Sequence, residues 1–379
     1  MRYFIIAGEP SGDMHGANLM KGLLAEDPAA EFKFWGGDKM AEVGGAENLL
    51  KHYKQSSFFG IFSILWNLRT ILGQISECKA QVAEYKPDVL ILIDYAGFNL
   101  KIAKFAHEIG IKTHFYIAPK VWAWNEGRIK LIRKYVDELF VIFPFERDYF
   151  TSKGIPPHFE GNPLVDALTQ RAETIPSREV FLERNNLPNR PIVALLCGSR
   201  RSEIKANLPF MVEISTRFPD HQFVVAGVDW IERTEYDKHL AGSGVQYICN
   251  QTYELLIHSE AALVTSGTAT LETALMRIPQ VVIFKIPKLH DIIRPYVLKV
   301  PFISLVNLNL KREAVREILQ SSPDPTPAIE ALSAIVEGGE GRAKMLQDYD
   351  ELSQIIGGDG ASRRFAAKIV SLLSPSKKI

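Results

Sequence analysis

The chain has 379 residues, and at about 150 residues per domain this length suggests two domains. Hydrophobic residues make up 46% and charged residues 23%, close to the averages of globular proteins, which excludes disordered, collagen-like and coiled-coil classes. The 44 basic and 44 acidic side chains cancel, which argues against a protein that binds nucleic acid over its whole surface.

The three cysteines, Cys78, Cys197 and Cys249, form neither a CxxC pair nor a zinc-ligand spacing. We therefore expect no disulfide framework and no metal site, and the reducing cytoplasm as the compartment. The apolar run at the start of the chain is too short for the hydrophobic region of a signal peptide. The longest apolar stretch, Phe58 to Trp66, is much shorter than the roughly 20 residues of a membrane-spanning helix, so no transmembrane span is predicted.

Short apolar runs alternate with longer helical patterns along the chain. The runs are 3–7, 32–35, 89–93, 114–117 and 139–143, and, after a polar segment at 166–190, 192–196, 223–226, 261–264 and 281–284. This alternation is typical of βαβ units and a parallel sheet.

The pattern therefore predicts an α/β fold with two Rossmann-like parallel-sheet domains. We expect an N-terminal domain at 1–170, a linker at 171–190 and a C-terminal domain at 191–345. The remaining helical segment, 346–379, would pack back on the first domain or on a partner chain. Ligands of open α/β sheets bind beyond the carboxyl ends of the strands, so two such domains facing each other would form a cleft between these ends.

The first predicted strand ends in a turn rich in glycine and polar residues, GEPSGD at 8–13. Its glycines allow a tight turn that leaves helix amides open to a phosphate or a sugar hydroxyl. We assign to substrate binding the residues Gly8, Glu9, Ser11, Gly12 and Asp13. The alternative is a turn in which Ser11 or Asp13 caps the following helix.

Asp94 directly follows the apolar strand 89–93. Partial removal of a carboxylate from water at such a position raises its pKa and suits a general base. The next helix starts near Asn99, which we assign to substrate binding, and capping this helix is the alternative role of Asp94.

The second domain opens with Gly198, Ser199 and Arg200 after the strand 192–196. An arginine fork and the amides of a helix start can together clamp a diphosphate, which we predict here; a capped turn with solvated arginines is the alternative. The sequence is not a Walker A loop, and the lack of GxGxxG argues against a Rossmann dehydrogenase.

A second helix start in this domain follows the strand 261–264. Ser266, Gly267 and Thr268 can offer amides and hydroxyls to phosphate, and Glu272, one turn later, can accept hydrogen bonds from ribose hydroxyls. A capping box is the competing explanation.

Taken together, these motifs resemble the lipid-A-disaccharide synthase family, which are GT-B-type glycosyltransferases, over nearly the whole chain. The segments that carry the resemblance, in the family's order, are 8–13 (GEPSGD), 57–60 (SFFG), 93–99 (IDYAGFN), 119–124 (PKVWAW), 143–146 (FPFE), 198–200 (GSR), 266–272 (SGTATLE) and 303–307 (ISLVN). The resemblance implies that Asp94 is the catalytic aspartate, Arg200 the essential arginine and Asn307 a substrate-binding asparagine.

Four positions depart from the family's pattern. Cys197 and Val306 stand where members often have proline, and Asn162 stands where many have histidine. Gly97 replaces a second aspartate of some members, so that Asp94 is the only acid of its strand-end motif.

The resemblance implies an inverting enzyme that transfers 2,3-diacylglucosamine from UDP to the 6-hydroxyl of 2,3-diacylglucosamine 1-phosphate without metal or other cofactor. Asp94 would deprotonate the acceptor, while Arg200 and the helix starts at Ser199 and Ser266 would neutralise the departing UDP. The alternative enzyme is another GT-B protein acting on UDP-N-acetylglucosamine, including the non-hydrolysing 2-epimerase. A catalytically silent lipid or nucleotide carrier is the alternative outside enzymes.

Residues 58–75 are apolar around most of a helical circumference, more than a helix facing a core needs. We assign to acyl chains or the membrane interface the residues Phe58, Phe59, Phe62, Leu65 and Trp66. Burial between domains is the alternative for this stretch.

These assignments predict a cytoplasmic protein bound peripherally to the inner membrane, with its two lipid substrates as partners, no nucleic acid, and a second copy of the chain as a further partner. Trp122 and Trp124 stay undecided between the core and a sugar platform. The basic residues at 128–134 stay undecided between a solvated helix face and a phosphate contact.

Overall fold

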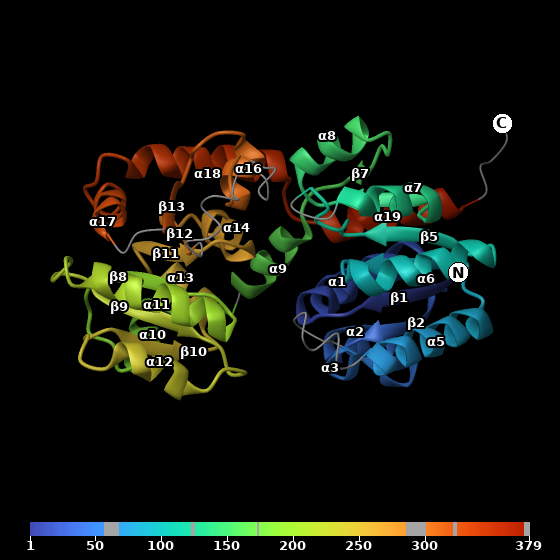
Figure 1. The fold of residues 1–379 in the computed structure, drawn as a ribbon, viewed down its shortest axis with the longest axis horizontal. Coiled ribbons are helices and arrows are strands. Elements are labelled where there is room, and N and C mark those ends of the chain that lie inside the picture. The colour runs from blue at the N-terminus through green and yellow to red at the C-terminus, as the bar shows by residue number, and fades with distance from the viewer. Residues whose placement is uncertain (57–67, 123–125, 173, 286–300, 321–323, 375–379) are drawn as a thin grey trace. The chain divides into compact units, whose positions relative to one another are not determined.

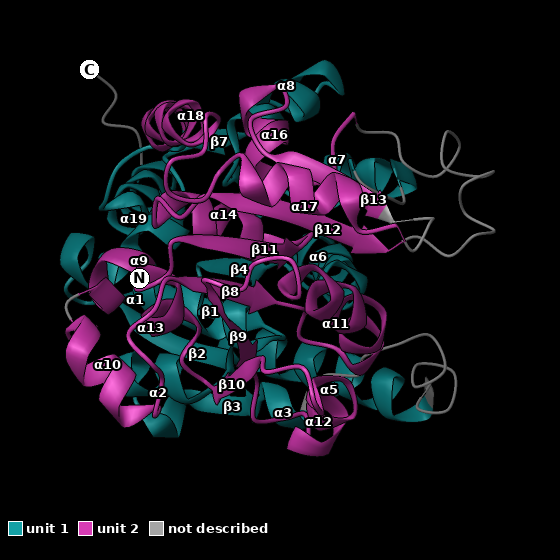
Figure 2. Cartoon of the chain, turned by 90° about the vertical axis from the view of Figure 1, so that its left-hand side faces the viewer, with its two compact units in different colours: residues 1–167, 356–379 teal, residues 168–355 magenta. Residues whose placement is uncertain are grey.

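The computed structural model describes residues 1–56, 68–122, 126–172, 174–285, 301–320 and 324–374. The chain divides into two units, residues 1–167 with 356–379 (unit 1) and residues 168–355 (unit 2), each built on one β-sheet (Figures 1 and 2). The residues assigned to acyl or membrane contact, 58–66, and Trp124 lie outside the described residues. None of the described helices is long and apolar enough to cross a membrane.

Unit 1 has a seven-stranded sheet in the order β3-β2-β1-β4-β5-β6-β7, in which the paired strands are parallel. Its elements are β1 (Arg2–Ala7), α1 (Pro10–Glu26), β2 (Glu31–Gly36), α2 (Asp38–Gly44), η1 (Ala46–Asn48), β3 (Leu49–His52), α3 (Tyr53–Ser56), α5 (Leu68–Tyr85), β4 (Val89–Ile93), α6 (Ala96–Glu108), β5 (Lys112–Tyr116), η2 (Glu126–Arg128), α7 (Ile129–Tyr135), β6 (Glu138–Val141), α8 (Pro144–Ser152), β7 (His158–Phe159), α9 (Pro163–Ala172), in which the unit boundary falls, and α19 (Ala361–Leu373).

Side chains of β1 alternate between two apolar cores, one on each face of the sheet. Phe4 and Ile6 pack with residues of α5, α6 and α7, whereas Tyr3 and Ile5 pack with residues of α1, α2 and α19. A strand covered on both faces has no solvated side, which explains why its sequence is continuously apolar.

The last helix, α19, packs on α1 and completes the core of unit 1, where Phe365 is fully buried. Asp166 in the first turn of α9 accepts hydrogen bonds from the backbone N–H groups of Gly360, Ala361 and Ser362 at 2.8, 3.1 and 2.8 Å. These N–H groups have no partner inside their own helix, so the carboxylate of Asp166 caps α19.

Unit 2 has a six-stranded parallel sheet in the order β10-β9-β8-β11-β12-β13. Its elements are α10 (Arg178–Arg184), β8 (Ile192–Leu196), α11 (Arg201–Ser215), β9 (Gln222–Gly227), α12 (Arg233–Leu240), β10 (Gln246–Cys249), α13 (Thr252–Ile257), β11 (Ala261–Thr265), α14 (Thr268–Leu275), β12 (Gln280–Lys285), α16 (Leu305–Leu310), β13 (Arg316–Gln320), α17 (Thr326–Ser333) and α18 (Arg342–Ile356).

Both sheets have the strand order of a Rossmann fold, to which unit 1 adds β7 at one edge. The order reverses between β1 and β4 in unit 1 and between β8 and β11 in unit 2. Open α/β sheets bind ligands outside the carboxyl ends of the strands at this reversal. The prediction of two Rossmann-like parallel-sheet domains is therefore confirmed.

The segment expected as a linker, 171–190, contains α10, and its Phe181 and Leu182 lie in the apolar core of unit 2. The segment expected as a C-terminal tail, 346–379, divides between α18, which belongs mainly to unit 2, and α19 in unit 1. Tyr349 of α18 is fully buried, and its hydroxyl accepts a hydrogen bond from the Gln280 amide at 3.3 Å. Both segments are thus parts of the folded units.

Replacing Asp166 by alanine should lower the free energy of unfolding by about 1–2 kcal/mol, because three N–H groups of α19 lose their acceptor. Urea denaturation followed by circular dichroism measures this change. Glu108→Ala is the control, since it removes an exposed ion pair with Lys104 and should cost less than about 0.5 kcal/mol. Equal stability of the two variants would contradict the capping role.

Candidate active site

Asp94 lies at the end of β4 in a strained backbone. Asp94 and the next residue, Tyr95, have φ angles of 44° and 46°, and Ile117 after β5 has 61°. Such left-handed conformations are uncommon for residues other than glycine and cluster at functional sites. The Asp94 N–H donates to the Ile117 carbonyl at 3.3 Å, and the Asn99 amide donates to the carbonyls of Ile93 and Asp94 at 3.2 and 2.8 Å. Asn99 is fully buried, so its amide positions Asp94.

The carboxyl group of Asp94 is half-buried and faces two cations. Burial raises its pKa, while the charges of Lys120 and Arg128 act against this rise. Burial lowers the pKa of the Arg128 guanidinium, and Asp94 acts against that change. The Arg128 guanidinium also lies 3.9 Å from the position that a Cβ would take at Gly97. A partly desolvated carboxylate with cations nearby can be ionised near neutral pH and still accept a proton.

The glycines of the first turn allow close packing next to this aspartate. A Cβ at Gly8 would lie 2.5 Å from the ring of Tyr95, and one at Gly12 would lie 3.2 Å from the Cβ of Ala7. The small residues therefore bring the start of α1 against the strand end that carries Asp94. Glu9 is half-buried and Ser11 exposed at this helix start.

Asp13 has a structural role in the next helix. It is 3% exposed, and its carboxylate accepts hydrogen bonds from the N–H groups of Gly37, Lys39 and Met40 at 2.7, 3.1 and 3.1 Å. We expected substrate binding or capping of its own helix; the structure shows that Asp13 caps α2 and not its own helix, and substrate binding stays a prediction. Its carboxylate is therefore engaged in holding two segments of unit 1 together.

In unit 2, the turn after β8 is closed by Glu203. Gly198 has a φ of 107°, and a Cβ there would lie 2.5 Å from the Glu203 side chain. Glu203 accepts hydrogen bonds from the N–H groups of Ser199 and Arg200 at 2.9 and 3.2 Å, and from the Arg200 guanidinium at 2.7 Å. The two amides expected to face phosphate thus donate to Glu203. Arg200 is 71% exposed, so a diphosphate would compete with Glu203 for a side chain at the surface.

The second helix start of unit 2 differs from a capping box. Gly267 is the N-cap of α14 and has no side chain to accept a hydrogen bond, and Gly267 and Thr268 are exposed. The Ser266 hydroxyl donates to the Ile303 carbonyl at 3.0 Å. Glu272 accepts a hydrogen bond from the Tyr253 hydroxyl at 2.8 Å, and burial raises the pKa of Glu272. The start of α14 therefore presents its backbone at the surface, with a carboxylate one turn further on.

Asn307 is fully buried, and both the oxygen and the nitrogen of its side-chain amide make hydrogen bonds. Its oxygen accepts from the N–H groups of Ala314 and Val315 at 2.8 and 3.0 Å. Its nitrogen donates to the Val315 carbonyl at 2.8 Å and to the Glu317 carboxylate at 2.9 Å. These bonds satisfy the amide, so Asn307 fixes the chain between α16 and β13 and acts on a ligand at most through backbone position.

Trp122, the described member of the tryptophan pair, is a core residue. Trp122 is 8% exposed, and its indole N–H donates to Glu146 at 2.9 Å. Glu146 also accepts from the N–H groups of Ile142 and Phe143 at 3.3 and 3.2 Å, and burial raises its pKa to about 7. Asn162 donates to the Ile142 carbonyl at 3.0 Å. Glu146 therefore joins Trp122 to the start of α8, and Asn162 bonds to the chain just before this helix.

The basic residues 128–134 have different environments. Arg128 faces Asp94, whereas Lys130 and Lys134 are exposed on α7 and Arg133 donates to the Lys153 carbonyl. Arg128 is therefore the member of this group that belongs to the candidate site.

Two residues that were not identified from the sequence, Trp230 and Tyr253, lie close to these motifs but outside them. Trp230, after β9, is 66% exposed and donates to the Ser199 carbonyl at 3.0 Å. Tyr253 follows β10, a strand that was not predicted. Each follows the carboxyl end of a strand, and this position is the signal that could have identified them.

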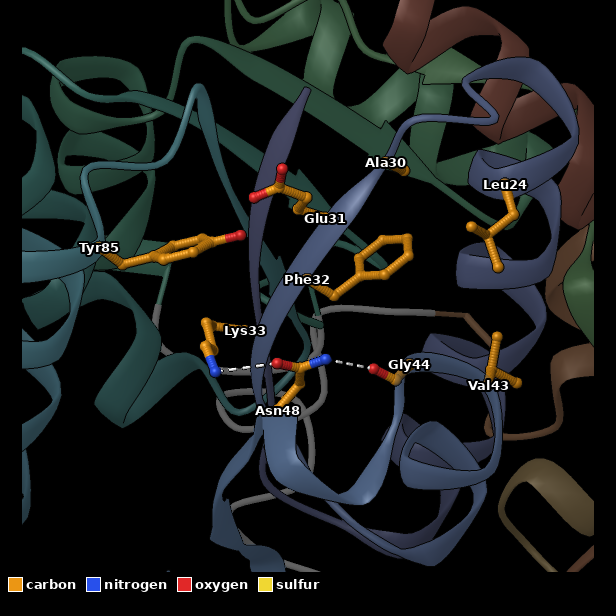
Figure 3. Close-up of a pocket in the computed structure, with 9 residues that line it drawn as sticks. All are labelled: Leu24, Ala30, Glu31, Phe32, Lys33, Val43, Gly44, Asn48 and Tyr85. Carbon is orange, nitrogen blue, oxygen red and sulfur yellow. Dashed lines mark hydrogen bonds between the residues drawn. The ribbon is translucent and has the colours of Figure 1, made fainter.

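A cavity of about 310 Å³ lies apart from these strand ends (Figure 3). It is lined by residues of β2 such as Phe32 and Lys33, and by Tyr85 of α5. Lys33 donates to Asn48 at 2.8 Å, and Asn48 donates to the Gly44 carbonyl at 2.7 Å. None of the nine residues that line it belongs to the motifs above. In the part of the chain that the structure describes, no group of three His, Cys, Asp or Glu side chains could hold a metal ion.

Two Rossmann-type sheets with polar motifs at both reversals of strand order define the class, the GT-B fold of glycosyltransferases and epimerases that act on nucleotide sugars. The chain is similar to UDP-GlcNAc 2-epimerase from Neisseria meningitidis, with a TM-score of 0.70, 15% sequence identity, and coverage of 98% of this chain and 100% of that one. At this identity the similarity carries the fold alone.

The family follows from the sequence comparisons. The family described as lipid-A-disaccharide synthetase matches residues 3–368. The chain is 36% identical to lipid-A-disaccharide synthase from Myxococcus xanthus over 386 residues, covering 99% of this chain and 98% of the relative. It is 32% identical to the enzyme of the same name from Trichlorobacter lovleyi over 388 residues, with the same coverage. The chain belongs to the lipid-A-disaccharide synthase family, which confirms the resemblance.

Replacing Asp13 by alanine should lower the melting temperature, because the N–H groups at the start of α2 lose a buried acceptor worth about 1–3 kcal/mol. Differential scanning calorimetry measures the change. Asp38→Ala is the matched control, since Asp38 is an exposed acid in the first turn of the same helix. Unchanged melting together with lost substrate affinity would favour a ligand-binding role for Asp13 over the cap.

Proposed function

We propose that the protein transfers 2,3-diacylglucosamine from UDP to the 6-hydroxyl of 2,3-diacylglucosamine 1-phosphate, giving a β-linked disaccharide and UDP. The observation that carries the proposal is the half-buried carboxyl of Asp94 at the strand reversal of unit 1, with Lys120 and Arg128 nearby. Membership of the lipid-A-disaccharide synthase family supports the choice of donor and acceptor.

In this proposal Asp94 is the general base. Its carboxylate takes the proton of the acceptor hydroxyl while that oxygen attacks the anomeric carbon on the side opposite the diphosphate. The bond from the anomeric carbon to the diphosphate oxygen breaks with its electron pair, through an oxocarbenium-like state, and the configuration inverts. The hydrogen bonds from Asn99 to the carbonyls of Ile93 and Asp94 hold the base in position.

Departing UDP gains negative charge, which groups of unit 2 would neutralise. The exposed Arg200 side chain would exchange its partner Glu203 for the diphosphate, in a charge-assisted hydrogen bond. Ser266, Gly267 and Thr268 at the start of α14 would add backbone amides and the positive end of the helix dipole. Glu272 would accept hydrogen bonds from the ribose hydroxyls. These groups supply the stabilisation of a leaving group for which we propose no metal ion.

We further infer that the protein acts in the cytoplasm at the surface of the inner membrane, where diacylated substrates would partition. Support comes from the apolar sequence at 58–75, which we assign to acyl chains. Leu72 of α5, at the described end of this stretch, is 53% exposed. We also propose that a second copy of the chain is a partner, as expected from the sequence analysis.

Asp94→Asn should lower kcat at least about a hundredfold, the contribution of a general base, and leave the affinity for UDP unchanged. In the unmodified protein kcat/KM should fall as the pH drops and Asp94 is protonated, at a pH above that of an ordinary aspartate because burial raises its pKa. Steady-state kinetics and calorimetric UDP titration test both points. Asp88→Asn, at the opposite end of the same strand, should keep full activity. An active Asp94→Asn enzyme would rule out Asp94 as the base.

Arg200→Ala should weaken UDP binding by about 1.5–3 kcal/mol, the range of a hydrogen bond to a charged group. The adjacent exposed arginine offers a matched control, Arg201→Ala, which should bind UDP as the unmodified protein does. Isothermal titration measures both affinities. Excess EDTA should leave turnover unchanged, and activity lost in EDTA and restored by magnesium would overturn the metal-free reaction.

A further inference from the structure

The Glu272 carboxylate accepts a hydrogen bond from a tyrosine, and an arginine side chain lies over the ring of that tyrosine. The Tyr253 hydroxyl donates to the Oε1 atom of Glu272 at 2.8 Å. The guanidinium carbon of Arg171 lies 4.5 Å from the centre of the Tyr253 ring, within the range of a cation–π interaction. The three residues come from α9, α13 and α14, all within unit 2 at these positions.

The contacts restrict both ends of the tyrosine. Its hydroxyl is fixed by a carboxylate, and its face is fixed by a guanidinium, so the phenol can neither rotate nor shift without losing one of them. The hydrogen bond holds the Oε1 atom of Glu272 and thereby restricts rotation of the carboxylate, whose other oxygen is not used in this bond. The positive charge of Arg171 acts on Glu272 as well and favours its ionised, accepting form against the effect of burial.

The position of Glu272 makes this restriction relevant to a ligand. Glu272 lies one helical turn beyond Thr268, the first residue of α14, whose start is exposed at the strand reversal of unit 2. A diphosphate at that helix start would bring the attached ribose within the same part of the site. A carboxylate recognises a pair of adjacent hydroxyls only when its two oxygens are correctly oriented.

We propose that Tyr253 is a positioning residue, held by Arg171, that orients Glu272 to bind the ribose hydroxyls of a uridine diphosphate. This inference rests on the proposed function, which supplies the nucleotide and the role of Glu272. It adds two residues, Arg171 and Tyr253, to the recognition of the nucleotide, and it makes the selection of a ribonucleotide depend on a side chain that need not touch it.

The test compares UDP with 2′,3′-dideoxy-UDP, which lacks both hydroxyls, by isothermal titration. The unmodified protein should bind UDP more tightly than the dideoxy compound. Tyr253→Phe keeps the ring under Arg171 but removes the hydroxyl, and it should weaken UDP binding about three- to tenfold while leaving the dideoxy affinity unchanged. Arg171→Met, which keeps an unbranched chain without the charge, should likewise weaken UDP binding and leave the dideoxy affinity unchanged.

Tyr247→Phe is the matched control, because Arg233 lies over the Tyr247 ring at 4.1 Å in the same unit without contact to Glu272. This control should bind both nucleotides as the unmodified protein does. If Tyr253→Phe retains the full preference for UDP, or weakens both nucleotides equally, the positioning role is wrong. If the unmodified protein and Glu272→Gln both bind the two nucleotides equally, the ribose contact of the proposed function fails, and the positioning role fails with it.

Discussion

The parallel pairing of β1 with β4 fixes the position of Asp94, the base that we propose for catalysis. The register pairs Ala7 with Ile93, so that Gly8 and Asp94 leave the sheet side by side. The pairing of β8 with β11 does the same in unit 2, where Leu196 lies opposite Val264. All strands of a parallel sheet point the same way, so each pair of strands places its two following loops at the same edge of the sheet. Both units share this arrangement.

The sequence predicts the central strands well and fails at the edges of the sheets. Central strands such as β4 are buried on both faces and show as continuous apolar runs. The four strands that were not predicted, β3, β7, β10 and β13, are the edge strands of the two sheets. They are short or rich in polar residues, since one side is not covered by a neighbouring strand, and they lack the apolar run that identifies a buried strand.

The location of the candidate site could be predicted, but the roles of several side chains could not. Asp, Asn, Ser and Glu at a strand-to-helix turn serve equally as helix caps and as ligand contacts. Only the partners distinguish the two, and these lie on other elements: Asp13 bonds to the start of α2 and Asn307 to Glu317 of β13. Tyr253 was missed for the same reason, because its partner Glu272 lies on another helix.

Unit 1 is discontinuous in sequence, whereas unit 2 is one uninterrupted stretch. During synthesis, the apolar face of the first sheet that receives Phe365 and Ile369 is covered only in part, by α1 and α2, until the ribosome has made α19. Unit 2 contains all of its core residues earlier and can fold while the chain is still being extended. The order in which the units become stable is therefore expected to be the reverse of their order along the chain.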